Sequence, residues 1–245
     1  MFAKMPFGLP LMMALAPIAL AHYTWIAPVG LWQPGKLARV EIGHGHQFPT
    51  SEESINAKQV QMFALAPSGE RIHLNPGPAG RALAASFLPK EDGVYRIAFI
   101  QDRGVTSRTA GGVKPGGRKQ NPNALSASRR LRTAVAYRST NKGLMPAAKP
   151  LGLELELCAE FVNGSWSLLV LRQGKPLAGA KVEVLPAGAT QAVELGRTGA
   201  SGRLRYEPPA NAKGPLLFSA ELEQPAEPGS DFDKLVLETS LSVNW

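Results

Sequence analysis

The sequence predicts an all-β protein made of two β-sandwich domains that follow a cleaved signal peptide. Of the 245 residues, 44% are hydrophobic, which is enough apolar surface for a packed core and excludes a disordered chain. The 25 glycines and 21 prolines argue against a long helical bundle, because both residues weaken helix interiors. Short apolar or alternating runs, separated by Gly, Pro, Asn and Ser, recur along the chain as they do in sandwiches.

Residues 1–21 have the pattern of a secretory signal peptide. Lys4 precedes an apolar stretch over residues 9–20, and small residues near Ala21 form a cleavage site. The apolar stretch is short and contains two prolines, so it is a poor membrane span; an uncleaved anchor or a buried helix is the alternative. We therefore expect a mature chain that begins at His22 and lies in the periplasm.

The N-terminal domain is expected to cover residues 22–145. Between residues 37 and 44, Val40 and Ile42 alternate with Arg39 and Glu41, so one face of that strand is apolar and the other solvated. The other runs have similar lengths and are bounded by turn residues. Strands are predicted at 22–26, 37–44, 59–65, 71–74, 83–88, 94–101 and 133–137.

A turn followed by Tyr95 introduces the strand at 94–101. Glu91, Asp92 and Gly93 precede the tyrosine, and the apolar run 97–100 follows it. This arrangement resembles the tyrosine corner of immunoglobulin-like sandwiches, in which the hydroxyl bonds back to the preceding backbone. A tight turn that leads into any strand is the alternative.

Residues 103–149 form a strongly basic segment. It contains eleven Lys and Arg residues and no acidic residue, and it is rich in Gly, Ser, Asn and Pro. We expect a long, mobile basic loop at 103–130, the strand 133–137, and a linker at 146–150. Because aromatic residues do not interleave with the basic ones, we expect no nucleic-acid partner. Contact with an anionic envelope surface, or a simply solvated loop, are the interpretations that remain.

The C-terminal domain is expected to cover residues 150–245 as a second small sandwich. The chain has one cysteine, which excludes an intrachain disulfide, CxxC zinc sites and thioredoxin-like chemistry. Cys158 follows an alternating strand, so we expect a small buried hydrophobic residue rather than a reactive thiol. Strands are predicted at 153–157, 166–171, 180–185, 202–206, 216–222 and 235–243.

Three of the four histidines form a candidate metal site. His44 and His46 are two residues apart, so on one strand their imidazoles point to the same face. His22, at the mature N-terminus, would add an imidazole and a free amine. Up to four nitrogen ligands suit Ni²⁺, Co²⁺, Cu²⁺ or Zn²⁺. The alternative is that His44 and His46 are polar residues of a Gly-rich loop. His73 alternates with apolar neighbours and is expected to face solvent.

Three segments carry a family resemblance. Residues 21–28 (AHYTWIAP), 43–49 (GHGHQFP) and 174–182 (GKPLAGAKV) resemble a family of secreted bacterial proteins. That family is catalogued as a domain of unknown function and is described as the periplasmic component of cobalt or nickel uptake systems. The third segment is also similar to transthyretin-like and immunoglobulin-like β domains. The resemblance implies divalent-metal binding, with Ni or Co favoured, at His22, His44 and His46, and a membrane metal transporter as partner.

Enzyme activity is not expected. The sequence contains no G-x-S-x-G elbow, HExxH helix or P-loop. One enzymatic alternative stays open, which is a copper-dependent oxidative enzyme with an N-terminal histidine brace. Such enzymes present an aromatic substrate face, and the four Trp and four Tyr form no visible cluster. A structural, envelope-binding β module is the third alternative.

Overall fold

The computed structural model describes residues 22–141, 149–209 and 214–243. These residues form β-strands and one 3-10 turn, η1 (Ala57–Gln59), so the all-β prediction is confirmed. Within them, no helix is long and apolar enough to span a membrane. The predicted signal peptide, residues 1–21, lies outside the described part of the chain, as does most of the predicted linker.

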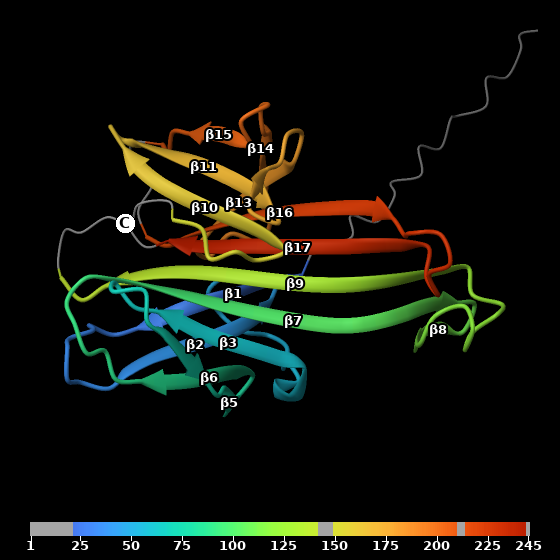
Figure 1. The fold of residues 1–245 in the computed structure, drawn as a ribbon, viewed down its shortest axis with the longest axis horizontal. Helices are drawn as coiled ribbons and strands as arrows, with labels where there is room; N and C mark the ends of the chain where they lie inside the picture. Colours follow the sequence, from blue (N-terminus) through green and yellow to red (C-terminus); the bar gives the residue numbers. More distant parts are fainter. Residues whose placement is uncertain (1–21, 142–148, 210–213, 244–245) are drawn as a thin grey trace, which may run out of the picture.

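Three sheets are stacked as layers (Figure 1). The four strands of sheet A are β1 (Tyr23–Val29), β2 (Ala38–Gly45), β6 (Ala82–Phe87) and β5 (Gly77–Ala79). The nine strands of sheet B are β14 (Val193–Arg197), β13 (Lys181–Pro186), β16 (Leu216–Pro225), β17 (Lys234–Val243), β9 (Ser126–Ser139), β7 (Val94–Thr109), β3 (Val60–Leu65), β4 (Arg71–Leu74) and β8 (Gly112–Pro115). The four strands of sheet C are β10 (Leu155–Val162), β11 (Ser165–Arg172), β12 (Lys175–Pro176) and β15 (Arg203–Tyr206).

Sheet B is the central layer, and the part of it between sheets A and C is buried on both faces. Successive residues of β7 face opposite sides, so Ala98 belongs to the core shared with sheet C, while Ile97 and Phe99 belong to the core shared with sheet A. On β9 the neighbours Val135 and Ala134 divide in the same way. A strand buried on both faces reads as a continuous apolar run, as residues 97–100 do.

The parallel pairing of β9 with β17 joins the two halves of the sequence. The ladder runs from Ser128 opposite Lys234 to Ala136 opposite Ser242. Thr133, which is buried, donates a 2.7 Å hydrogen bond to the carbonyl of Leu155 and so ties the seam to sheet C. One sheet therefore continues through both predicted sandwiches. The division at residues 145–150 into two domains stays a prediction.

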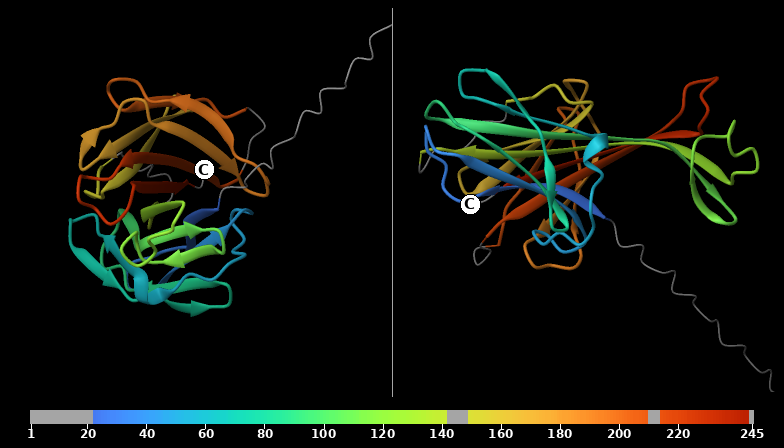
Figure 2. Two further views of the ribbon diagram at one scale, coloured as in Figure 1. Left: turned by 90° about the vertical axis from the view of Figure 1, so that its right-hand side faces the viewer. Right: turned by 90° about the horizontal axis from the view of Figure 1, so that it is seen from below.

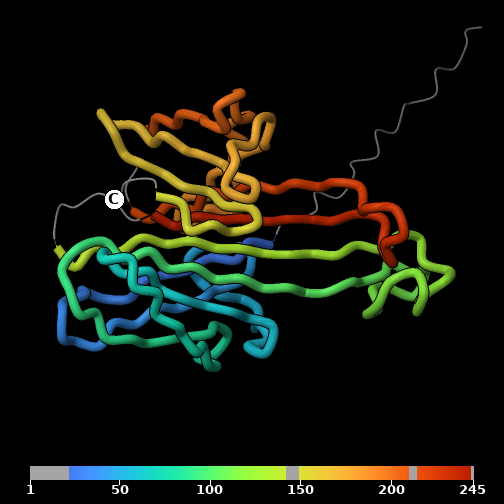
Figure 3. The backbone as a smooth tube through the Cα atoms, viewed as in Figure 1, coloured from blue at the N-terminus to red at the C-terminus, as the bar shows by residue number. Residues whose placement is uncertain are grey.

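The prediction of a long loop at residues 103–130 is wrong, because most of these residues are in β-strands. β7 continues to Thr109, turns into β8, and β9 begins at Ser126. With β16 and β17, these strands extend beyond the sandwiches as a long, twisted arm (Figures 2 and 3). Polar and Gly-rich residues suit this arm because sheets A and C do not cover it, so an apolar strand pattern is not required. A register shift between Asp102 and Val105 marks its base.

A buried carboxylate holds the chain where it enters sheet C. Glu156 is fully buried and accepts hydrogen bonds from the backbone N–H groups of Leu151 and Gly152, at 2.6 and 3.0 Å. Beside it, Cys158 is also fully buried, and burial raises the pKa of its thiol well above the usual range. The prediction of a small, buried cysteine is confirmed.

The tyrosine corner is confirmed. Tyr95 is fully buried, and its hydroxyl oxygen accepts from the backbone N–H groups of Lys90 and Glu91, at 3.1 and 3.2 Å. The hydroxyl also donates to the Glu91 carbonyl at 3.1 Å. This single hydroxyl therefore satisfies three backbone groups of the turn that leads into β7.

We expect Tyr95→Phe to lower the free energy of unfolding by about 1–2 kcal/mol, because three backbone groups lose their partner without loss of the ring. Urea denaturation measures the change. Tyr206→Phe is the matched control, since among the described residues the Tyr206 hydroxyl has no hydrogen-bond partner. An unchanged stability for Tyr95→Phe would contradict this reading of the corner.

Candidate functional site

The β1–β2 hairpin brings the three predicted histidines together. Antiparallel pairing sets Tyr23 opposite Gly45 and Thr24 opposite His44, so His22 lies at the same end of the hairpin as His46. The ring centroid of His22 is 5.4 Å from that of His44 and 3.8 Å from that of His46. His73 lies on β4 and is exposed, as predicted, and takes no part. The histidine cluster consists of His22, His44 and His46.

The glycines around His44 accommodate side chains of the protein. A Cβ at Gly43 would lie 2.3 Å from the indole of Trp25, and one at Gly45 would lie 2.5 Å from the Glu52 carboxylate. The space that the glycines leave is therefore occupied by an indole beneath the strand and a carboxylate beside it. Trp25 is buried and packs edge-on against Phe48 at 5.6 Å, which fixes the floor of the hairpin.

Two carboxylates lie next to the histidine cluster. Glu53 lies 2.8 Å from the Nε2 atom of His22 and 3.7 Å from that of His44. Glu52 accepts from the backbone N–H of His46 and lies 3.2 Å from the Nδ1 of the same residue. The hydrogen bond from His22 holds the pKa of Glu53 below its usual range, and the backbone N–H of His46 does the same for Glu52.

The backbone fixes the orientation of His44. Its Nδ1–H donates to the carbonyl of Tyr23 at 2.8 Å, so the lone pair of the neutral ring is on Nε2. Burial, and then the nearby Arg132 cation, lower the pKa of His44 to about 4. The imidazole is therefore neutral at pH 7, the form in which it can act as a ligand or a hydrogen-bond acceptor.

An arginine from the central sheet reaches the cluster. Arg132 of β9 is 7% exposed, and its Nη1 donates to the Nε2 of His44 at 3.2 Å. Glu238 of β17 pairs with both Arg132 and Arg130 across the parallel seam. Burial lowers the pKa of Arg132 to about 9, which still leaves it charged at pH 7. The positive charge of Arg132 therefore lies directly against the Nε2 lone pair.

The structure thus gathers every histidine that the sequence analysis selected, together with three residues that it missed. Glu52 and Glu53 follow His46 closely in sequence, so a search for carboxylates near the histidine pair would have found them. Arg132 is 88 residues from His44, and no sequence signal connects the two. Across residues 22–141, 149–209 and 214–243, no three His, Cys, Asp or Glu side chains already adopt an arrangement that could hold a metal ion.

Comparisons with known proteins identify a family. A family model described as "Domain of unknown function (DUF4198)" matches residues 19–224. A search of curated proteins finds no match. Two solved structures are similar: a DUF4785 family protein from Legionella pneumophila (12% identity, TM-score 0.29, 80% of this chain and 52% of that one) and a tetra-tandem repeat from the extending region of a large adhesion protein (9% identity, TM-score 0.28, 91% and 50%). The chain spans about half the length of each.

We expect Gly43→Ala to lower the free energy of unfolding by about 1–3 kcal/mol, because the added methyl overlaps the Trp25 indole. Thermal unfolding measures the loss, and near-UV circular dichroism reports the displaced indole. Gly77→Ala in β5 is the matched control, since nothing lies within 4 Å of its added Cβ. Equal stabilities of the two variants would contradict the close packing of Trp25 on Gly43.

Proposed function

The chain belongs to the family described as a domain of unknown function, DUF4198, and from that premise we propose that it binds a divalent transition metal in the periplasm. In this proposal Ni²⁺ or Co²⁺ is cargo, bound by His22, His44 and His46. The protein acts as an accessory component that hands the metal to a membrane transporter. Binding and transfer of the metal require only metal–ligand exchange and no covalent reaction, so the proposed role is not enzymatic.

The observation that carries the proposal is the convergence of three imidazoles with two carboxylates at one end of the β1–β2 hairpin. Ring-centroid separations of 5.4 and 3.8 Å are small enough that rotations of the exposed His22 side chain would bring ring nitrogens around one point. Neutral imidazole is a preferred ligand for Ni²⁺, Co²⁺, Cu²⁺ and Zn²⁺, and a carboxylate adds compensating charge.

The chemistry of the donors fits such a cation. The Nδ1–H of His44 is held by the Tyr23 carbonyl, the type of outer hydrogen bond that orients histidine ligands and leaves Nε2 to bind. Glu53, which lies near both His22 and His44, is suited to bind directly or to orient His22. In the unprocessed chain, the backbone nitrogen of His22 is part of a peptide bond. Cleavage after Ala21 would convert it to an amine and add a fourth nitrogen donor.

Arg132 opposes metal binding in the described arrangement. Its guanidinium donates a hydrogen bond to the Nε2 lone pair of His44, so a cation that binds this nitrogen would have to displace the guanidinium. Glu238 already pairs with Arg132 and is suited to retain it after displacement. Displacement lowers the net affinity, and a moderate affinity suits a protein that releases its cargo.

We expect the processed chain, stripped with a chelator, to take up about one Ni²⁺ or Co²⁺. Affinity should fall at least about ten-fold in His44→Ala, in His46→Ala, and when one extra residue precedes His22, because each change removes a nitrogen donor. Isothermal titration calorimetry measures the affinities, and intact mass verifies the N-terminus.

His73→Ala is the matched control, because it removes an exposed imidazole outside the cluster. Unchanged binding when all three cluster changes are combined would refute the site. Tight binding of copper alone, together with peroxide-dependent oxidation of a polysaccharide, would favour the histidine-brace enzyme. No metal uptake at all would leave the structural envelope module.

We expect Arg132→Met to raise the affinity for Ni²⁺ by about ten-fold, because a full positive charge next to His44 is removed. Arg130→Met is the control, since it removes the other arginine on Glu238 and leaves the His44 contact intact. The same calorimetric titration measures both variants, with thermal unfolding as a check on the fold. An affinity that Arg132→Met leaves unchanged would indicate that His44 is not a ligand.

A further inference from the structure

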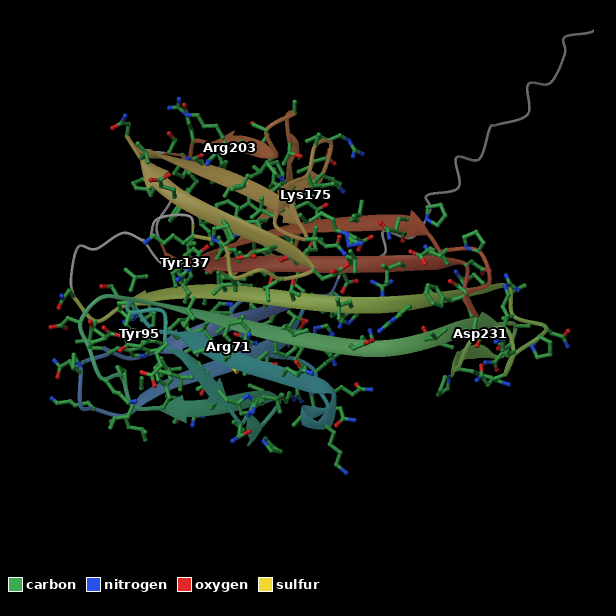
Figure 4. All side chains as sticks on the ribbon, in the orientation of Figure 1. Arg71, Tyr95, Tyr137, Lys175, Arg203 and Asp231 are labelled. Atoms are coloured by element: carbon green, nitrogen blue, oxygen red, sulfur yellow. The ribbon has the colours of Figure 1, made fainter. Side chains whose placement is uncertain are left out.

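The arm carries basic side chains at its far end that the histidine cluster does not use. The arm consists of residues 102–130 and 223–234, and its tip consists of β8, the loop 116–125 and the turn 226–233. Figure 4 labels Asp231 at this end, far from Tyr95 in the core. Lys114 and Lys119 of the tip, and Arg108 of the adjoining end of β7, have exposed side chains with no acidic side-chain partner among the described residues. By contrast, Arg118 and Arg129 pair with aspartates at 2.6 Å.

Two exposed apolar residues neighbour one of these basic residues along the backbone. Val113 is the cross-strand partner of Arg108, and the backbone N–H of Leu125 donates to the Arg108 carbonyl at 2.8 Å. Val113 is 73% exposed and Leu125 is 68% exposed. Exposed aliphatic residues beside basic ones match a surface that both attracts anions and enters an apolar layer.

The tip is built as a fixed structure. Arg118 pairs with Asp233 through two hydrogen bonds, at 2.6 and 2.8 Å, and the backbone N–H of Lys119 donates to Asp231 at 2.6 Å. A Cβ at Gly117 would lie 2.0 Å from the Asp231 carbonyl oxygen, so the two segments approach at the backbone. Asp231 and Asp233 thus hold the loop in shape. Glu227 is the exposed carboxylate of the turn that has no partner among the described residues, against the three basic side chains of Arg108, Lys114 and Lys119.

From this placement we propose that the arm tip docks on an anionic lipid surface. Arg108, Lys114 and Lys119 contact the headgroups, while Val113 and Leu125 enter the interfacial layer. Each basic residue near an anionic membrane contributes attraction, and the two aliphatic side chains add the apolar contact that a polar polyanion cannot offer. An acidic protein would pair with the same basic residues, but it gives no reason for two bare aliphatic side chains. The proposal is independent of metal binding.

Flotation with lipid vesicles tests the proposal. The processed chain from residue 22 is used, because the apolar residues 9–20 would bind vesicles by themselves. We expect binding to vesicles of phosphatidylglycerol and phosphatidylethanolamine, none to pure phosphatidylcholine, and weakening as NaCl is raised. Combined Arg108→Gln, Lys114→Gln and Lys119→Gln should reduce binding at least about ten-fold. Val113→Ser with Leu125→Ser should reduce it by a similar factor.

Leu31→Ser with Leu37→Ser is the matched control, since these residues are 75% and 73% exposed on the loop that joins β1 to β2. An unchanged midpoint of thermal unfolding in the arm variants shows that their fold is intact. Absence of vesicle binding by the unaltered chain overturns the proposal, as does a loss confined to the Leu31 and Leu37 variant. Vesicle binding that needs the three basic residues but neither aliphatic one would overturn the insertion of Val113 and Leu125 and leave a purely electrostatic contact with the headgroups.

Discussion

Between sheets A and C, sheet B is buried on both faces, and this double burial constrains the sequence of its strands and the position of the histidine cluster. β7 and β9 must present apolar side chains to sheet A and to sheet C at alternate positions, which is why Ile97, Ala98 and Phe99 are all fully buried. β9 then pairs in parallel with β17, so residues near position 130 and residues near position 240 share one ladder. The histidine cluster lies against this seam through Arg132 and Glu238, and the arm continues from the same strands.

Most of the fold was predictable because its strands follow local rules. The alternation of Val40 and Ile42 with polar neighbours marks a half-buried strand, and the tyrosine corner at Tyr95 is a short-range motif; both are found as predicted. The arm was not predictable in this way. Its strands have no apolar face to bury, so residues 103–130 carry the composition of a loop, and they form strands through the pairing of β7 with β8 and with β9.

The candidate site was also predictable only in part. The close spacing of His44 and His46 predicted a common site, although β2 ends at Gly45 and His46 lies just beyond the strand. Pairing of β1 with β2 places His22 next to both rings. Arg132 could not be found from sequence, since it reaches His44 from another sheet and its relevance depends on tertiary contact alone. The packing of the Trp25 and Glu52 side chains against Gly43 and Gly45 likewise appears only in the folded structure.

The single, buried cysteine has a practical consequence. Cys158 is fully buried, its thiol pKa is raised by burial, and the chain has no second cysteine. Refolding from denaturant therefore requires no oxidant and cannot be diverted into mispaired intrachain disulfides. Since the thiolate is the reactive form, maleimides and nitroxide labels will find no competing group in the folded protein. One cysteine introduced anywhere on the surface can thus be labelled selectively for distance measurements, without first replacing a native residue.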